Sequence, residues 1–299
     1  MPCPYCNHSG SSKSYLPSTG FNDKIFRYVK CDNCEVVYIT PLPEQSDYYK
    51  MYPPDYQQGV DRTILPDPYK KLSGLRFSYG VQFDLIKKHF KGSPRMLDYG
   101  CGNANFLLNA SAHGFTCDGV EFNQEHVDIL KKEIPTSKFY TINEFLNSPQ
   151  VTYDIIRLSN VLEHLDTPVE TIRAIVGKLN PGGLLLIEGP IEMNTNLAML
   201  SRKLYFKLKN ISKGGYIADH TPTHITFTNS TNQLRFFSQF ELLPLEFKTQ
   251  ESPWPYPNSF SSASGVGGKV KALIAKISIF VSSSFTGWGN TFIYVGRKK

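Results

Sequence analysis

Two hydrophobic periods alternate along the middle of the chain. Short apolar runs predict strands, and between them apolar residues recur at the three- and four-residue spacing of amphipathic helices. The pattern predicts strands at 95–99, 116–121, 137–141, 153–158 and 183–189, and helices at 104–113, 123–133, 143–147 and 167–178. Regular alternation of strands and helices predicts an α/β fold, in which a parallel sheet carries helices on both faces.

The segments on either side of this alternation predict additions to the sheet. A helix is expected over 69–91, with an apolar face formed by Leu72, Leu75, Phe83, Ile86 and Phe90. Residues 190–223 break the alternation and predict a helical insertion that caps the active site. We then expect a helix at 230–238, a strand at 241–248, a loop at 252–268 and a last, antiparallel strand at 291–296.

Residues 269–283 predict an amphipathic helix. Its apolar residues at helical spacing are Val270, Leu273, Ile274, Ile277 and Val281. This helix either packs on the domain or lies on a membrane surface or at a subunit contact, and the sequence leaves both interpretations open. Lys276 interrupts the apolar run, so no segment here is expected to span a membrane.

Composition is that of an ordinary globular protein, with 299 residues, of which 40% are hydrophobic and 19% charged. The formal net charge of +6 suits an anionic small substrate or an anionic membrane surface. This net charge is smaller than that of typical nucleic-acid-binding proteins, so no nucleic-acid partner is expected. Because the N-terminus lacks the pattern of a signal peptide, we expect a cytoplasmic protein, peripheral at the inner face of the membrane if 269–283 lies on lipid. The oligomeric state stays open.

Four cysteines near the N-terminus form two C-x-x-C pairs, with 24 residues between the pairs. These are Cys3, Cys6, Cys31 and Cys34. In a reducing compartment such spacing favours a structural zinc site with four thiolate ligands over two disulfides or redox-active pairs. We therefore predict a zinc ribbon at 1–43, with strands at 25–29 and 36–39.

Residues 44–66 are rich in tyrosine and proline and predict an irregular cover. The residues concerned are Tyr48, Tyr49, Tyr52, Pro53, Pro54 and Tyr56. The segment is either a packed aromatic linker or a source of side chains for a substrate pocket. With the helix that follows, it forms a region at 44–92 between the ribbon and the main domain at 93–299, whose cap insertions are expected at about 190–223 and 252–288.

The most informative stretch runs from Met96 to Leu107, where an apolar strand end leads through an acid and a glycine-rich turn into a helix. Glycine lets a ligand lie against bare backbone. Glu121 follows at about the distance of the ribose-binding acid in a Rossmann-type unit. Asp98, just before the first glycine, opposes a pyrophosphate and favours a cation, so S-adenosylmethionine (SAM) fits better than a dinucleotide.

Four motifs in order resemble those of class I SAM-dependent methyltransferases. They are Leu97–Gly102, the pair Val120 and Glu121, the strand and loop 153–165, and the turn and strand 179–187. The resemblance covers residues 93–189 well and the rest loosely, and Ala104 stands where many members have a third glycine. It implies a Rossmann-like fold with a mostly parallel seven-stranded sheet and SAM as the methyl donor.

The same resemblance and the chemistry of SAM assign cofactor contacts. We expect Asp98 to help hold the methionine end, Gly100 and Gly102 to approach SAM through their backbone, and Glu121 to accept both ribose hydroxyls. Phe122 is expected against the adenine, Asn143 at the adenine edge and Asn160 at the methionine part.

Glu163 and His164 lie just past the carboxyl end of the fourth predicted strand, where open α/β sheets place their ligands. In the sugar methyltransferases that this chain resembles, an equivalent Glu-His pair faces the substrate. His164 is the first candidate for the base that takes a proton from the acceptor, with His224 and His220 as rivals. A structural role that anchors a loop is the alternative for each histidine.

The ribbon, the Tyr-rich segment and the methyltransferase core together resemble enzymes of deoxysugar and surface-polysaccharide biosynthesis. The resemblance implies methylation of a sugar, nucleotide-linked or within a glycan, and the basic residues of 202–213 are compatible with a phosphate-bearing acceptor. An O-methyltransferase of a quinone or other small metabolite is the first alternative. An RNA methyltransferase or a zinc-ribbon binding module is the second.

Overall fold

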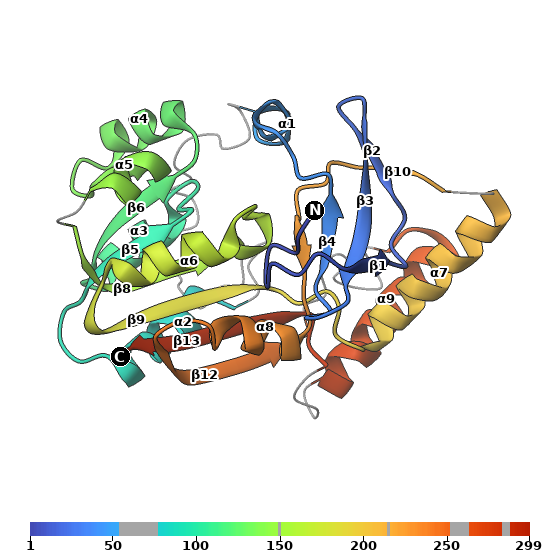
Figure 1. The fold of residues 1–299 in the computed structure, drawn as a ribbon. Helices are drawn as coiled ribbons and strands as arrows, with labels where there is room; N and C mark the ends of the chain where they lie inside the picture. Colours follow the sequence, from blue (N-terminus) through green and yellow to red (C-terminus); the bar gives the residue numbers. More distant parts are fainter. Residues whose placement is uncertain (54–76, 149–150, 214–215, 252–262, 283–287) are drawn as a thin grey trace.

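A computed structural model describes residues 1–53, 77–148, 151–213, 216–251, 263–282 and 288–299. A large sheet with helices on both faces lies beside a smaller sheet built around the N-terminal segment (Figure 1). Two long helices, α7 (Leu197–Lys213) and α9 (Gly265–Ser282), lie beyond the smaller sheet.

The large sheet has seven strands in the order β12-β13-β9-β8-β5-β6-β7. These are β5 (Arg95–Tyr99), β6 (Thr116–Glu121), β7 (Phe139–Thr141), β8 (Tyr153–Ser159), β9 (Leu179–Pro190), β12 (Leu242–Gln250) and β13 (Thr291–Lys298). Strands β5 to β9 pair in parallel, whereas β13 runs antiparallel to both of its neighbours. The predicted Rossmann-like sheet with an antiparallel last strand is confirmed, although β9 begins four residues earlier than predicted.

Helices cover both faces of this sheet because successive strand residues point to opposite sides. Leu97 and Tyr99 belong to one buried cluster, and Met96 to another. The first cluster includes side chains of α5 (Ile142–Asn147), α6 (Pro168–Gly177) and α8 (Ser230–Phe237). The second includes side chains of α2 (Tyr79–His89), α3 (Asn105–Ala112) and α4 (Gln124–Glu133).

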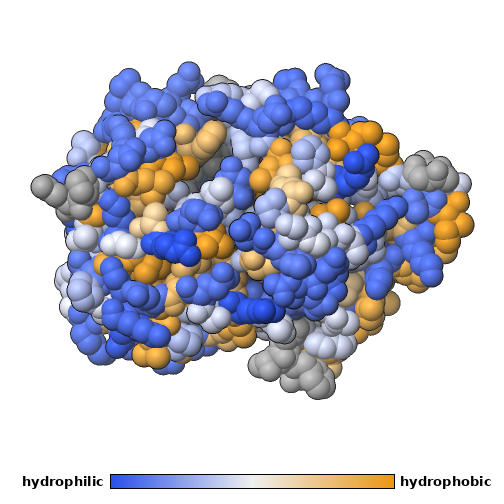
Figure 2. Space-filling model, viewed as in Figure 1, coloured by the Kyte–Doolittle hydropathy of each residue, from blue (hydrophilic) through white to orange (hydrophobic). Residues whose placement is uncertain are grey.

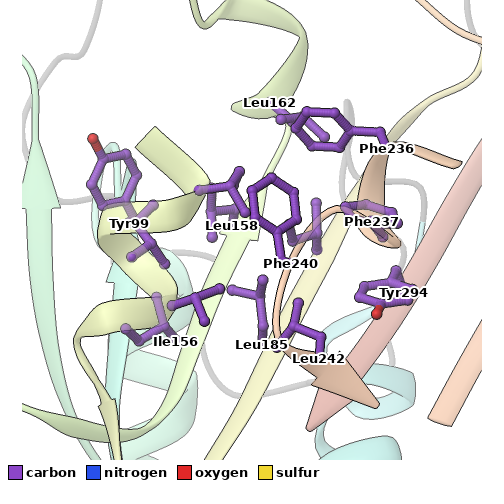
Figure 3. Packing of buried hydrophobic residues seen from close by; sticks show 14 of the residues in the cluster. Tyr99, Ile156, Leu158, Leu162, Leu185, Phe236, Phe237, Phe240, Leu242 and Tyr294 are labelled. Carbon is purple, nitrogen blue, oxygen red and sulfur yellow. The ribbon is translucent and has the colours of Figure 1, made fainter. Parts of the chain in front are cut away.

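Helix α8 connects the sheet to the N-terminal segment. The ring of Phe237 stacks on Tyr294 of β13 with centroids 4.0 Å apart, and Phe236 lies 4.3 Å from Tyr5. Figure 3 shows Phe236 beside Leu162, which belongs to the short 3-10 helix η3 (Leu162–His164) after β8, and Phe237 above Tyr294. The aromatic contacts therefore join the sheet, the N-terminal segment and the loop that carries His164.

The smaller sheet combines the N-terminal segment with strands from much later in the chain. Its strands are β1 (Ser11–Lys13), β2 (Thr19–Phe21), β3 (Lys24–Cys31), β4 (Val37–Thr40), β10 (Ala218–Asp219) and β11 (Thr226–Phe227). The strands predicted at 25–29 and 36–39 correspond to β3 and β4. Strand β10 pairs with β2 and β11 with β4, so residues 218–227 complete the sheet of the N-terminal segment.

Two predicted elements differ in the structure. Residues 45–51 form helix α1 (Gln45–Met51), where the sequence predicted an irregular cover, because Glu44 and Asp47 form a capping box. Helix α9 begins at Gly265, four residues before the helix predicted at 269–283, in a stretch predicted as loop. Leu72, Leu75 and most of the loop predicted at 252–268 lie outside the described residues.

Helix α7 confirms the predicted helical insertion and packs against α9 (Figure 1). Among the described residues, no helix is long and apolar enough to cross a bilayer.

Candidate functional site

A cavity of about 470 Å³ opens where β5, β6 and β8 end. This is the edge at which parallel α/β sheets bind their ligands. Its described lining residues are Tyr48, Tyr52, Pro53, Tyr99, Gly100, Gly102, Val120, Glu121, Phe122, Asn123, His126, Ile142, Ser159, Asn160, Val161, His164, Leu165 and Asp166. The cavity thus brings together Gly100, Gly102, Glu121, Phe122, Asn160 and His164 of the residues predicted from sequence.

The turn after β5 requires glycine at its first position. Gly100 has a φ of +79°, and a Cβ there would lie 2.4 Å from Cγ2 of Val161. A side chain at position 100 would therefore be both strained and crowded. Ala104 also has a positive φ, +59°, where many of the resembling proteins have glycine.

Glu121 holds this turn against the end of β6. One carboxylate oxygen accepts a hydrogen bond from the backbone N–H of Gly102 at 2.8 Å, and the other accepts from the N–H of Phe122 at 2.8 Å. The Gly102 carbonyl lies 2.9 Å from Nε2 of His126. The carboxylate is fixed in the cavity wall before any ligand arrives, which is what a preformed ribose site needs.

The cavity is electrostatically suited to a cation. Among the described residues that line it are the acids Glu121 and Asp166, and none is lysine or arginine. A pyrophosphate would meet carboxylates with no basic side chain to offset them, whereas a sulfonium and an ammonium group would be attracted.

Asp98 lies beneath the turn, outside the described cavity wall. It is 1% exposed, and Oδ1 is 2.5 Å from a guanidinium nitrogen of Arg157 on β8. Burial raises the pKa of Asp98, and the charge of Arg157 opposes that rise. Arg157 also donates to the side chain of Gln82 and lies 4.0 Å above the ring of Phe106. Asp98, predicted to help hold the methionine end, is thus placed outside the described wall and paired with Arg157.

Three other predicted cofactor contacts have different placements. Phe122 is 44% exposed at the cavity, 6.4 Å from the rings of Tyr48 and Tyr52. Asn160 lies in the wall with a φ of +52°, and its side chain donates to Glu188 at 3.3 Å. Asn143 is exposed and lies outside the described wall, which Ile142 reaches instead.

His164 follows β8 in η3 and faces the cavity. Its Nδ1 lies 2.7 Å from the carbonyl oxygen of Thr223 and 3.0 Å from the hydroxyl of Tyr52. Because a carbonyl only accepts, Nδ1 carries the proton, and in the neutral ring Nε2 is then the nitrogen without one. Burial and the neighbouring His224 lower the pKa of His164 to about 3, so the ring is neutral at physiological pH.

Glu163 and His224 complete a cluster around His164. A carboxylate oxygen of buried Glu163 lies 3.7 Å from Nε2 of His164, where it favours a proton that arrives on that nitrogen. The rings of His164 and His224 are 4.9 Å apart, and Nδ1 of His224 donates to Glu192 at 2.8 Å. The fold thus brings the predicted catalytic residues Glu163 and His164 together with His224, which follows His164 by 60 positions.

A second cavity, of about 230 Å³, lies on the His224 side of this cluster. Its described lining includes hydrogen-bonding side chains from the smaller sheet, from α7 and from the segment between β10 and β11. These polar residues are Tyr28, Glu192, Arg202, His220, Thr221, Thr223 and His224. His220, the other rival base, lies here within 3.3 Å of the hydroxyls of Thr19 and Tyr28.

Sequence reasoning missed several residues of the site. Arg157 and Glu192 were not singled out, although a lone arginine within the apolar run of β8 was a usable signal, and Arg202 was considered only as one of the basic residues of 202–213. The cavity wall takes Tyr48, Tyr52 and Pro53 from the Tyr-rich segment, while Tyr49 is 59% exposed. Pro54 and Tyr56 lie outside the described residues.

The four N-terminal cysteines converge as the spacing predicted. The sulfur atoms of Cys3 and Cys34 are 3.5 Å apart, those of Cys6 and Cys31 are 3.6 Å apart, and all four lie within 4.8 Å of one another. None forms a disulfide. Tetrahedral zinc with Zn–S bonds of about 2.3 Å separates its sulfur ligands by about 3.8 Å, so this donor set fits a zinc ion.

Comparison with known proteins identifies the family. A family model described as "Methyltransferase domain" matches residues 65–240, more than half of the chain. The chain belongs to this methyltransferase family. The match contains the glycine turn, Glu121 and the Glu163–His164 pair.

Curated relatives are more distant. The chain is 25% identical over 122 residues to a ubiquinone biosynthesis O-methyltransferase of Vibrio parahaemolyticus, covering 39% of this chain and 50% of that protein. It is 27% identical over 127 residues to a protein of the same name from Coxiella burnetii, covering 40% and 53%. The methyltransferase chain thus spans about half the length of the curated relatives it matches.

Solved structures support the fold of this methyltransferase. The [4+2]-cyclase SpnF matches with a TM-score of 0.51 at 15% identity, over 86% of this chain and 97% of that one. A complex between a Haloferax volcanii Trm112 methyltransferase activator and a methyltransferase matches with a TM-score of 0.50 at 13% identity, over 73% and 93%. These similarities concern the fold alone.

The buried pair beneath the glycine turn can be tested for its structural role in this methyltransferase. Asp98→Asn leaves the buried guanidinium of Arg157 without its charged partner, so we expect a loss of about 3–5 kcal/mol in unfolding free energy. The double variant Asp98→Leu with Arg157→Met should recover most of this loss. Urea denaturation measures both, and an unchanged stability of Asp98→Asn would refute the structural role.

Proposed function

We propose that the protein transfers the methyl group of SAM to a hydroxyl of a sugar, either in a nucleotide-linked deoxysugar or in a residue of a surface glycan. The observation that carries the cofactor assignment is the cavity at the strand ends. Its described wall has the acids Glu121 and Asp166 and no lysine or arginine, and Gly100 and Gly102 of the glycine turn line it.

In this proposal, each part of SAM has a group that fits it. The carboxylate of Glu121 accepts the ribose hydroxyls, and the exposed ring of Phe122 lies against the adenine. Asn160 and the glycine turn lie beside the methionine part. SAM supplies an electrophilic methyl group on sulfur, so the chain has to position the acceptor, exclude water and remove one proton.

His164 is the proposed base. The acceptor oxygen forms a bond to the methyl carbon as the carbon–sulfur bond breaks, and the hydroxyl proton passes to Nε2 of His164. The hydrogen bond from Nδ1 to Thr223 keeps Nε2 free of a proton beforehand. Glu163 stabilises the imidazolium that results, because its carboxylate lies 3.7 Å from Nε2.

The second cavity supports a sugar as the acceptor. Its described wall presents hydroxyl, carboxylate, imidazole and guanidinium groups, a set that suits a polyhydroxylated molecule. Arg202 in this wall adds a group able to bind a phosphate of a nucleotide-sugar. An acceptor that reaches past the His164–His224 pair would occupy both cavities.

The second candidate is an O-methyltransferase of a quinone or other small metabolite. It is favoured by the names of the curated relatives, which are ubiquinone biosynthesis O-methyltransferases. An RNA methyltransferase is the third. Transfer of labelled methyl groups to a panel of nucleotide-sugars, catechols and RNA separates the three, and a catechol as the only acceptor would overturn the sugar proposal.

We further propose that the four cysteines hold a structural zinc ion. A site closed by four thiolates leaves no position for substrate, so the ion would act on folding and not on the reaction. Cys31 ends β3, and Cys34 lies just before β4, so an ion there would fix the turn between these two strands.

The ribose assignment predicts a selective loss of cofactor binding. Glu121→Ala removes a charged acceptor for two hydroxyls, and we expect the Kd for SAM to rise by about 10- to 100-fold. Isothermal titration of the folded variant measures this. Glu125→Ala, an exposed acid four positions later, is the matched control and should bind SAM normally. Unchanged affinity in Glu121→Ala would remove Glu121 from the site.

The base assignment predicts a change in rate without a change in cofactor affinity. His164→Asn keeps a donor for the Thr223 carbonyl but lacks a base, so kcat should fall by about 10²- to 10⁴-fold while the Kd for SAM is retained. His113→Asn, at the residue that caps the C-terminus of α3, is the control and should keep its rate. If His224→Asn loses activity and His164→Asn does not, the base is His224.

The zinc proposal predicts one zinc ion per chain in elemental analysis. Cys31→Ser with Cys34→Ser should lose the metal and lower the melting temperature, because metal binding contributes to the folding free energy. Cys117→Ala, which removes a buried thiol outside the cluster, should keep the zinc content of the natural protein. Purified protein without metal and with full stability would refute this site.

A further inference from the structure

Helix α9 faces the protein with its small residues and faces solvent with its large ones. Its buried positions are Ala272, Ala275 and Ser278, each at most 3% exposed. Val270, Leu273 and Ile277 are between 44% and 49% exposed and share another side of the helix. This is the reverse of the pattern by which a surface helix packs on its own core.

Helix α7 repeats this arrangement. Leu200, Leu204, Leu208 and Ile211 recur at helical spacing and are 48% to 71% exposed. Arg202 and Phe206 line the second cavity. Each is two positions from Leu204 and therefore lies on the opposite side of the helix. The inward side of α7 belongs to the proposed acceptor site, and its apolar stripe points away from it.

The two apolar stripes lie on neighbouring helices, because α7 and α9 pack against each other (Figure 1). Figure 2 shows hydrophobic side chains at the right-hand edge of the molecule, where α7 lies in the same view. Exposed apolar stripes on adjacent helices mark a surface for association with something outside the fold.

The charges on these helices indicate what that partner is. Neither helix contains an aspartate or glutamate, and together they carry eight basic residues: Arg202, Lys203, Lys207, Lys209, Lys213, Lys269, Lys271 and Lys276. The net charge of the whole chain is only +6, so the remainder of the chain is slightly acidic. Apart from Arg202, which lines the second cavity, these basic residues belong to the helices that expose the apolar stripes.

We propose that α7 and α9 form a docking surface for an anionic lipid bilayer. The apolar stripes enter the boundary between headgroups and acyl chains, and the lysines lie at the level of the lipid phosphates. Neither helix crosses the bilayer, in agreement with the absence of a spanning helix among the described residues. A second copy of the chain fits poorly, because two surfaces that both lack acids would repel each other.

The proposed docking surface does not depend on the proposed reaction, but α7 contributes residues both to this surface and to the second cavity. The same helix that exposes Leu204 and Leu208 places Arg202 in the second cavity. A bound protein would therefore present the acceptor side of its site close to the membrane surface.

Flotation with lipid vesicles tests the proposal. The protein should float with vesicles of phosphatidylglycerol and phosphatidylcholine at about 0.1 M salt, where charges more than ~10 Å apart are screened. It should not float with vesicles of phosphatidylcholine alone. Lys207→Gln, Lys269→Gln and Lys271→Gln together should lower the partition coefficient by about 100-fold, since each surface lysine contributes about fivefold. Leu204→Ser with Leu208→Ser should lower it by at least about tenfold.

Matched controls separate this surface from general charge and hydrophobicity. Lys91→Gln, Lys132→Gln and Lys138→Gln remove the same charge elsewhere, and Ile129→Ser with Leu234→Ser removes exposed apolar residues of α4 and α8. These variants should float like the natural protein, and all variants should keep the Kd for SAM.

Three results would overturn the proposal. The first is equal flotation with neutral and anionic vesicles, and the second is an equal loss of flotation in the control variants. The third is a dimer in light scattering that the two leucine substitutions dissociate, with no binding to vesicles; the occupant would then be a second copy.

Discussion

The backbone of Ile225 joins three parts of the protein, and the geometry of the reacting end of the site depends on it. Its N–H donates to the carbonyl of Glu163 at 2.7 Å, and its own carbonyl accepts from the N–H of Ile39 at 3.0 Å. Glu163 lies after β8 of the large sheet, and Ile39 lies in β4 of the smaller one. One residue therefore holds the Glu163–His164 loop in register with the N-terminal sheet, and two residues earlier the Thr223 carbonyl accepts the proton of His164 Nδ1. The N-terminal segment is in this sense part of the site, because it fixes the strand on which the histidine depends.

Charge is distributed unevenly between the cavity at the strand ends and the two helices α7 and α9. The cavity at the strand ends keeps two carboxylates, Glu121 and Asp166, while the acid beneath it, Asp98, is matched by Arg157. A buried carboxylate at position 98 without a charged partner would lower the stability of the fold. Pairing Asp98 with Arg157 leaves the attraction for a cation at the surface of the cavity, where a ligand can use it. Eight of the 32 lysines and arginines lie on α7 and α9, two helices without an aspartate or glutamate.

The sequence predicted the features whose causes are local. A glycine turn, an acid at the next strand end and two C-x-x-C pairs each determine their geometry within a few residues, so Glu121, Gly100 and the cysteine cluster were found. The strands of the large sheet were found because burial on both faces leaves a strong apolar run. Contacts between distant segments left no such pattern. Tyr52 and His164 are 112 positions apart, so the aromatic wall was only one of two interpretations of the Tyr-rich segment. Strands β10 and β11 are two residues long, so the completed small sheet was not predicted.

Helix α9 shows a further limit of periodicity. Its apolar residues at helical spacing predicted a stripe, and the usual inference is that such a stripe faces the core. The stripe exists, but the core takes the alanine and serine side instead, because small residues let α9 approach the body closely. A helix can be held in place by small side chains while its large ones remain available, so hydrophobic spacing alone does not reveal which face is inside. The charge pattern of the helix gives information about its surroundings that the spacing of its apolar residues does not. A helix whose basic residues flank an outward apolar stripe, with no acid on the helix to pair with them, has the charge and hydrophobicity that the proposed contact with an anionic bilayer requires.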